Sequence, residues 1–123
     1  MARGMQRARP PADISPVDFF TRWVPEAVSA DETRRRKLGS TRAVIVFDLQ
    51  GQGGGRFTVS IENGVLDARE GDRETADLRV FLDVETWRAL NDGSISAPEA
   101  LLRRRLKFEG DALLGLKLHV ILG

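Results

Sequence analysis

Side chains that often act as bases, nucleophiles and metal ligands are scarce in this chain of 123 residues, which has one histidine, His119, and no cysteine. A catalytic triad needs a base held between a nucleophile and an orienting carboxylate, and neither stands near His119 in the sequence. We therefore interpret His119 as a packed or frayed side chain without a catalytic role. The sequence predicts a protein that is not an enzyme, with no catalytic residue, no metal site and no cofactor.

Two other stretches could hold an ion or a phosphate group. EGDRETAD, residues 70–77, carries four carboxylates but lacks the spacing and the central glycine of a calcium-binding loop. GQGGG, residues 51–55, leads into a predicted strand, whereas phosphate loops lead into a helix whose free N–H groups bind the anion. We interpret the first stretch as a solvated loop and the second as a hairpin loop.

Positive charge is concentrated in two runs, RRRK at residues 34–37 and RRR at residues 103–105. Two interpretations stay open for both runs. The side chains lie near helix ends on a solvated face, or they make transient contact with an anionic membrane. Aromatic residues are not interleaved with the arginines, so we expect no nucleic-acid partner.

The elements that must position these residues begin with helices. Ser15, followed by proline, predicts a helix N-terminus, Pro25 predicts a break or restart, and Gly39 ends the helical region. We expect residues 1–14 to form a flexible tail, because no apolar stretch of a secretory signal follows their basic residues.

From residue 43 the apolar pattern becomes that of strands. Residues 43–49 are an apolar run typical of a strand buried on both faces, and residues 56–62 alternate. Asn63 and Gly64 predict a two-residue hairpin turn with positive φ at both residues. Further strands are expected at residues 65–69, 78–83 and 106–109, and helices after the capping residues Asp83, Ser96 and Asp111.

This order of elements predicts a single α+β domain over residues 15–123, with the helices packed on one face of a sheet. Its last helix is unusual. GDALLGLKLHVILG, residues 110–123, would show apolar side chains on nearly every side. Leu113, Leu116 and Val120 share one face and the other leucines turn toward a second. One face must pack on the sheet, and a ligand, a partner chain or the first helix must cover the other.

Residues 77–118, DLRVFLDVETWRALNDGSISAPEALLRRRLKFEGDALLGLKL, resemble the sterol carrier protein type 2 (SCP-2) family of lipid-binding domains. The shared pattern is an Asp before a strand, a short helix with an aromatic residue, Asp92-Gly93, Pro98, a strand that ends at Gly110-Asp111, and a leucine-rich helix. Upstream, VIVFDLQG and FTVSIENG stand where the family has its first two strands. The resemblance covers about residues 16–118.

Two features depart from the family pattern. Arg105 stands where many members have a small residue, and the chain ends in Ile-Leu-Gly in place of a peroxisomal Ser-Lys-Leu address. We therefore infer no peroxisomal location. We expect a cytoplasmic protein, with which the lack of cysteine is compatible. The 16 arginines against three lysines indicate a bacterial source.

The resemblance implies a five-stranded mixed or antiparallel sheet, helices on one face, and an apolar tunnel that holds acyl chains or sterols. It predicts a carrier of a fatty acid, an acyl-CoA or a sterol-like lipid. A second hypothesis is an accessory or interaction domain of the same fold with a filled core, which pairs through its apolar C-terminal helix, for example as a homodimer. The expected ligand contacts are Phe20, Phe57, Val59, Leu82, Trp87, Leu90, Leu102, Phe108, Leu113, Leu116 and Val120.

Overall fold

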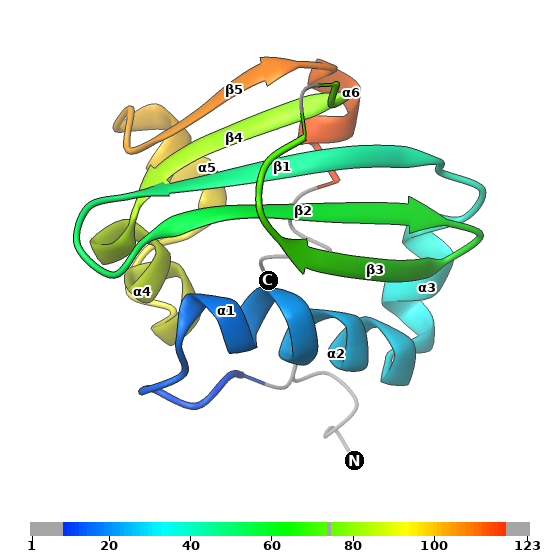
Figure 1. Cartoon of the computed structure of the whole chain (residues 1–123), viewed down its shortest axis with the longest axis horizontal. Coiled ribbons are helices and arrows are strands. Elements are labelled where there is room, and N and C mark those ends of the chain that lie inside the picture. The colour runs from blue at the N-terminus through cyan, green and yellow to red at the C-terminus, as the bar shows by residue number, and fades with distance from the viewer. Residues whose placement is uncertain (1–8, 74, 118–123) are drawn as a thin grey trace.

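Five strands form one sheet in the computed structural model, which describes residues 9–73 and 75–117 (Figure 1). The strand order is β3-β2-β1-β4-β5. The central strand β1 pairs antiparallel with β2 and parallel with β4, so the sheet is mixed. The strands are β1 (Ala43–Gln50), β2 (Gly55–Glu62), β3 (Val65–Glu70), β4 (Leu78–Asp83) and β5 (Leu106–Gly110).

Both predicted hairpin connections are present. Asn63 and Gly64 join β2 to β3 with φ values of 53° and 77°, which confirms the expected two-residue turn. The glycine-rich residues 51–54 join β1 to β2, and Gly54 N–H donates to the carbonyl oxygen of Gly51 at 3.1 Å.

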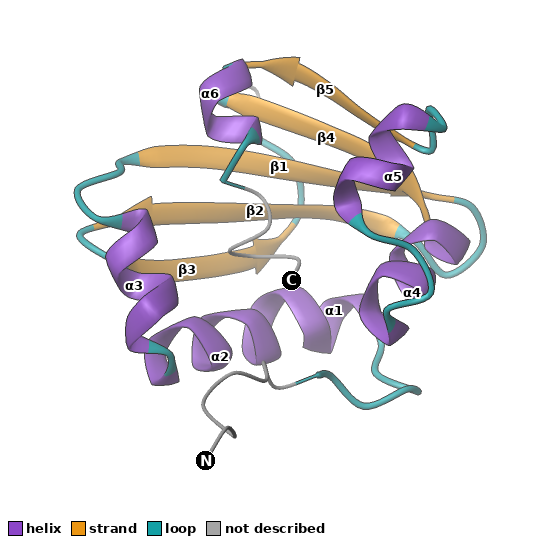
Figure 2. Ribbon diagram, turned by 180° about the vertical axis from the view of Figure 1, so that it is seen from behind, coloured by secondary structure: helices purple, strands orange, loops and turns teal. Residues whose placement is uncertain are grey.

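The helices lie on one face of the sheet, which Figure 2 views directly. Their first turns are capped as the sequence predicted. The side chains of Ser15, Asp83, Ser96 and Asp111 each accept a hydrogen bond from a backbone N–H group. The helical segments are α1 (Pro16–Asp18), η2 (Phe19–Trp23), α2 (Val24–Ala30), α3 (Glu32–Leu38), α4 (Val84–Asp92), α5 (Ala97–Leu102) and α6 (Ala112–Gly115).

Pro25 does not break the first helix: of the two outcomes expected there, a break or a restart, the structure shows a restart, with Pro25 in the first turn of α2. The helix runs on from α1 to α2 through the π-helical segment η2, in which Val24 N–H donates to the carbonyl oxygen of Phe19. Proline has no N–H group to donate to the residue four positions before it. The wider turn of a π-helix shifts the hydrogen-bond partners, so the chain accommodates Pro25 without leaving the helical path.

The two faces of the sheet differ in chemistry. The inner face, toward the helices, is apolar, and Phe47 there pairs in register with Phe57 on β2 and with Val80 on β4. The core contains Phe20, Val24, Ile45, Phe47, Phe57, Val59, Leu78, Val80 and Trp87, all at most 1% exposed.

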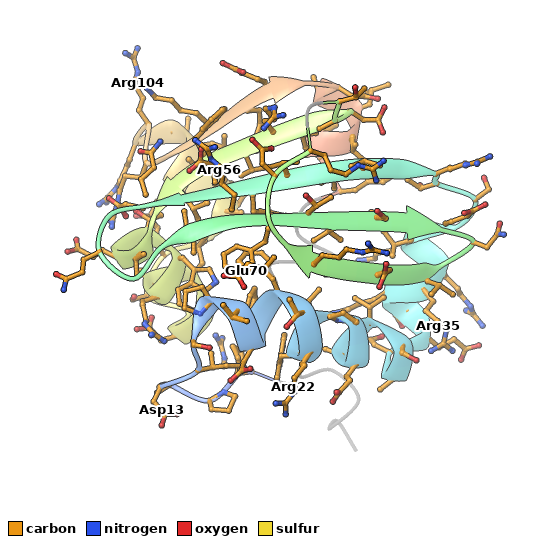
Figure 3. The ribbon with its side chains drawn as sticks, in the orientation of Figure 1. Asp13, Arg22, Arg35, Arg56, Glu70 and Arg104 are labelled. Carbon is orange, nitrogen blue, oxygen red and sulfur yellow. The ribbon has the colours of Figure 1, made fainter. Side chains whose placement is uncertain are left out.

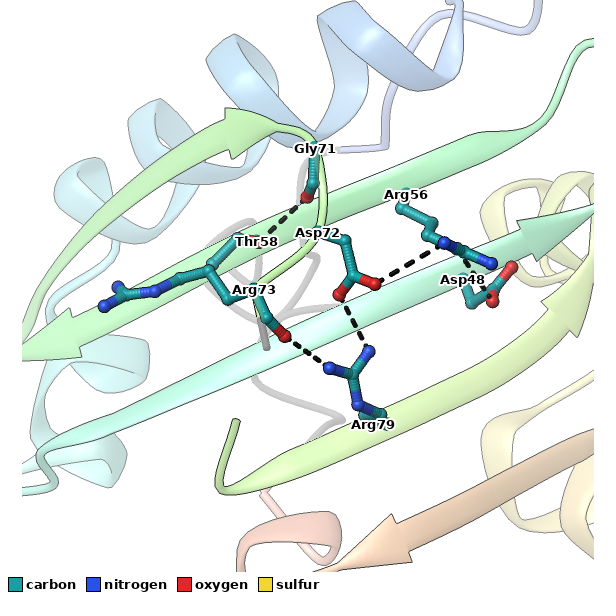
Figure 4. A network of polar contacts seen from close by, with 7 residues as sticks. All are labelled: Asp48, Arg56, Thr58, Gly71, Asp72, Arg73 and Arg79. Atoms are coloured by element: carbon teal, nitrogen blue, oxygen red, sulfur yellow. Dashed lines mark hydrogen bonds and ion pairs between the residues drawn. The ribbon is translucent and has the colours of Figure 1, made fainter. Parts of the chain in front are cut away.

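The outer face is crossed by the connection between β3 and β4, described at residues 71–73 and 75–77, which passes in front of the sheet in Figure 1. Asp72 pairs with both Arg79, at 2.8 Å, and Arg56, at 3.5 Å (Figure 4). The hydrogen bond from Arg79 is the main reason that the pKa of Asp72 is lowered. The carboxylate of Asp77 accepts from Val44 N–H at 2.7 Å. The acidic stretch that we expected to be a solvated loop is thus fastened to the sheet through two of its carboxylates.

Candidate ligand-binding site

An aromatic cluster fills the layer between the inner face of the sheet and the first helix. Phe20 stacks on Phe57 with ring centroids 4.8 Å apart and lies 4.9 Å from Phe47. Phe19 meets Phe20 edge to face at 4.9 Å and Trp87, on α4, at 5.3 Å. Edge-to-face and stacked rings at these distances attract one another beyond their area of contact, so the cluster joins β1, β2, the first helix and α4.

The π-helical segment contains both of the neighbouring phenylalanines of this cluster. Phe19 is 1% exposed and Phe20 is fully buried, although they are adjacent in the chain. In a regular helix, consecutive side chains are about 100° apart. Both rings nevertheless lie in the core, within the wider turn of η2.

The structure brings six of the predicted contact residues into this buried layer. They are Phe20, Phe57, Val59, Leu82, Trp87 and Leu90, each at most 9% exposed. Phe108 is half-buried and packs against the same core. Phe19 and Phe47 were not among the ligand contacts predicted from the sequence. The signals that could have found them are the adjacent pair Phe19-Phe20 and the position of Phe47 within the apolar run of β1.

Three other predicted contact residues lie at the surface. Leu102, Leu113 and Leu116 are 85%, 75% and 70% exposed. The described part of the last helix, α6, is only four residues long, and it turns Leu114 and Gly115 inward instead. Val120 and His119 lie outside the described residues.

Helix α6 packs closely against β5. A Cβ atom at Gly115 would lie 2.8 Å from Cε2 of Phe108, closer than van der Waals contact allows. Asp111 accepts hydrogen bonds from the N–H groups of Leu113 and Leu114, and Lys117 Nζ donates to Thr41 Oγ1 at 2.6 Å. These contacts fix α6 against the sheet and leave Leu113 and Leu116 facing outward.

The aromatic cluster contains a buried polar atom without a partner. The indole nitrogen Nε1 of Trp87 is buried and has no hydrogen-bond acceptor among residues 9–73 and 75–117, and the whole side chain is 0% exposed. The ring itself is held in place, since the Arg88 guanidinium lies 4.7 Å from its centroid and donates to the carbonyl oxygen of Ile14. Buried N–H donors in folded proteins almost always have an acceptor, so this atom is a place where an oxygen of a bound molecule would be stabilised.

The first helical turn of α4 places Trp87 through a network of polar contacts. Asp83 Oδ1 accepts from Thr86 N–H at 2.7 Å, and Arg105 Nε donates to Thr86 Oγ1 at 3.0 Å. The hydrogen bond from the Thr86 side chain is the largest of the effects that lower the pKa of Asp83. The network keeps the start of α4 against the strand that precedes it.

The two basic runs have different surroundings. Arg34 is only 3% exposed and pairs with Asp31, and Arg36 pairs with Glu32 at 3.2 Å. In the second run Arg103 pairs with Glu99 at 2.9 Å, and Arg105 is bonded to Thr86. Several of these arginines therefore have structural partners within the protein.

No cluster of three acidic or histidine side chains that could hold a metal ion occurs within residues 9–73 and 75–117. Among the helices in the same ranges, none is both long and apolar enough to cross a membrane.

Comparison with known proteins agrees with this architecture. The profile of the SCP-2 sterol transfer family matches residues 24–123. The fold resembles palmitated SCP2L2 from Aedes aegypti, with a TM-score of 0.68 at 18% identity over 89% of this chain and 95% of that one. It also resembles the apo form of sterol carrier protein 2 from Yarrowia lipolytica, with a TM-score of 0.57 at 20% identity over 86% and 82% of the two chains.

An enzyme is also among the structural relatives. The stereoselective inverting sec-alkylsulfatase Pisa1 from Pseudomonas sp. matches with a TM-score of 0.65 at 20% identity over 88% of this chain, which spans only 16% of the sulfatase. A search of curated proteins found no match to the sequence.

Proposed function

This chain belongs to the SCP-2 sterol transfer family, and on that premise we propose that it is a non-catalytic lipid carrier. Its ligand would be a fatty acid, an acyl-CoA or a similar lipid, bound in the layer between the inner face of the sheet and the helices. We also propose a cytoplasmic location, with which the absence of cysteine is compatible.

The unpartnered indole N–H of Trp87 is the observation that carries this proposal. It lies in a layer of Phe, Leu and Val side chains, where an unsatisfied donor is costly. A lipid would supply an apolar chain against the rings and an oxygen for the N–H group. Ligand pockets commonly combine many apolar contacts with a few polar groups that fix orientation.

Within this proposal the ligand enters beside α6. Leu113 and Leu116 present apolar side chains to solvent at 75% and 70% exposure, and α6 rests on Phe108 at the edge of the buried layer. An exposed apolar rim next to an apolar interior would guide a hydrocarbon chain inward. In this arrangement the residues predicted as ligand contacts divide into an inner set, around Trp87, and a rim.

Substitution of Trp87→Phe tests the assignment, because it removes the N–H donor and keeps a ring. We expect the variant to bind a fluorescent fatty acid about tenfold more weakly, the effect of losing one hydrogen bond to a charged oxygen. A fluorescent hydrocarbon without a carboxyl group should bind the variant and the original protein equally. Trp23→Phe is the matched control, since Trp23 is only half-buried and stacks on the outer side of Phe19.

The second hypothesis, an interaction domain, is favoured by the same two exposed leucines of α6. Paired across a two-fold axis they would bury each other without any ligand. Native mass spectrometry of freshly purified protein distinguishes the two functions. Co-purified lipid on a monomer supports the carrier, whereas a ligand-free dimer that Leu113→Ser and Leu116→Ser dissociate supports the interaction domain.

A further inference from the structure

An exposed tip comprises the last two residues of the short helix α5 and the turn that leads to β5. We define this tip as residues 101–105, Leu-Leu-Arg-Arg-Arg. Leu102 is 85% exposed and Leu101 is 38% exposed. Figure 3 shows Arg104 pointing away from the body of the molecule at this end. The tip therefore presents an apolar side chain and positive charge next to each other.

The backbone at the tip holds an arginine in a conformation that favours glycine. Arg104 has a φ of 60°, in the left-handed region. Its N–H donates to Leu101 and that of Arg105 donates to Ala100, at 3.1 and 2.8 Å. This is a Schellman motif, in which glycine normally occupies the left-handed position because it has no Cβ atom. A glycine would satisfy the same two hydrogen bonds without strain, so these bonds do not require the side chain of Arg104.

The three arginines of the tip are not equally engaged. Arg103 pairs with Glu99 at 2.9 Å. Arg105 donates to Thr86 at 3.0 Å and lies 3.8 Å from Glu85. In the part of the chain that the structure describes, no carboxylate forms an ion pair with Arg104. Its guanidinium is therefore the charge at the tip that is open to an external anion.

We propose that the tip is a docking site for an anionic membrane surface. Leu102 enters the boundary between headgroups and acyl chains, and Arg104 binds lipid phosphate groups, for which a planar guanidinium is well suited. A lipid-water interface offers an apolar layer and negative charge side by side, which is the chemistry that the tip presents. The proposal rests on the carrier function for its purpose, since a carrier needs a membrane from which to take its lipid.

Binding of the protein to sedimented vesicles, without added ligand, tests the docking site. One set of vesicles contains phosphatidylcholine only and the other contains phosphatidylserine as well. We expect binding to the anionic vesicles, weakened by salt because exposed charges are screened. Arg104→Gly should weaken binding about fivefold, and Leu102→Ser should weaken it at low and high salt alike. Both substitutions should leave the melting temperature unchanged or, for Arg104→Gly, slightly higher.

Arg36→Ala is the matched control, because it removes one exposed arginine from α3 and should leave binding unchanged. The proposal is overturned if the original protein ignores the anionic vesicles, if neither tip substitution weakens binding, or if Arg36→Ala weakens it equally. The last result would indicate a response to net charge alone. If the protein binds lipid in solution but does not bind the vesicles through its tip, the carrier function is retained and only the docking site is refuted.

Discussion

The basic run of α3 and the basic tip after α5 lie at opposite ends of the molecule, as Arg35 and Arg104 show in Figure 3. Both are strings of arginine in the sequence. In α3, Arg34 shares a buried helix face with Leu38, four residues later, and its side chain is 3% exposed. At the tip the helix has already ended, and Arg104 stands in a left-handed turn next to the exposed Leu102.

This difference shows that the sequence of a basic run does not determine whether its side chains are buried or exposed. The backbone conformation of the run decides that. Within a helix, a residue four positions from a core leucine is carried inward whatever its chemistry. Beyond a helix end, a turn can expose the same residue type to solvent. One arginine of the first run therefore contributes to stability, while Arg104 costs stability and is available for binding.

The largest expected effect concerns Arg34. Arg34→Ala removes a buried stem and the contacts of its guanidinium with Asp31. We expect the free energy of unfolding to fall by about 2–3 kcal/mol, measured by urea denaturation. Arg36→Ala, which breaks an exposed pair with Glu32, should change it by less than about 0.5 kcal/mol. Similar small losses of unfolding free energy from both variants would contradict the distinction between a buried, stabilising Arg34 and an exposed Arg36.

A smaller loss is expected from Arg105, the anchored arginine of the tip. Arg105→Ala removes the donor that reaches the buried hydroxyl of Thr86. The loss should be about 1 kcal/mol of unfolding free energy. Arg103→Ala breaks only an exposed pair with Glu99 and should cost less than about 0.5 kcal/mol. If the two variants are equally stable, the bond to Thr86 does not anchor the tip.

The anchor also predicts a pH dependence, because Thr86 caps α4 together with Asp83. Hydrogen bonds from Thr86 lower the pKa of Asp83 in the folded state. A lowered pKa stabilises the fold above the ordinary value of the unfolded chain, about 3.9, and this stabilisation is lost as the pH falls through the folded value. Asp83→Asn keeps a capping oxygen without a titrating group, so its unfolding free energy should fall less between pH 6 and pH 3. Parallel pH profiles would contradict this role of Asp83.

Much of the fold could be predicted from local sequence signals. The alternation of residues 56–62, the hairpin at Asn63 and the capping side chains depend on neighbours in the chain, and the structure confirms them. The path of residues 71–77 could not be predicted, because Asp72 finds Arg56 and Arg79 only after the sheet has formed. The π-helical turn before Pro25 likewise depends on which rings the core accepts.

The candidate site was predictable where a residue belongs to a long regular element. Phe57, Val59 and Leu82 lie on strands whose period fixes the inner face. The leucines after residue 100 were harder to assign to the interior or the surface, because their predicted faces depended on a long, regular terminal helix. The described α6 is four residues long, and the close contact between Gly115 and Phe108 decides which side faces inward. Contacts between distant segments of this kind leave no periodic signal in the sequence.

The smallest expected effect is the most informative for the tip. An L-residue in the left-handed region costs about 1 kcal/mol, while glycine loses about 0.5 kcal/mol through the greater freedom of the unfolded chain. Arg104→Gly should therefore raise the free energy of unfolding by about 0.5 kcal/mol. Arg104→Ala should not, because it keeps the Cβ atom at a φ of 60°. Urea denaturation of the two variants side by side measures the difference. A destabilised glycine variant would show that the arginine side chain supports the fold, and the proposed separation between an anchored Arg105 and an available Arg104 would fail. Stabilisation by glycine together with weaker binding to anionic vesicles would show that Arg104 lowers stability and serves contact with the membrane.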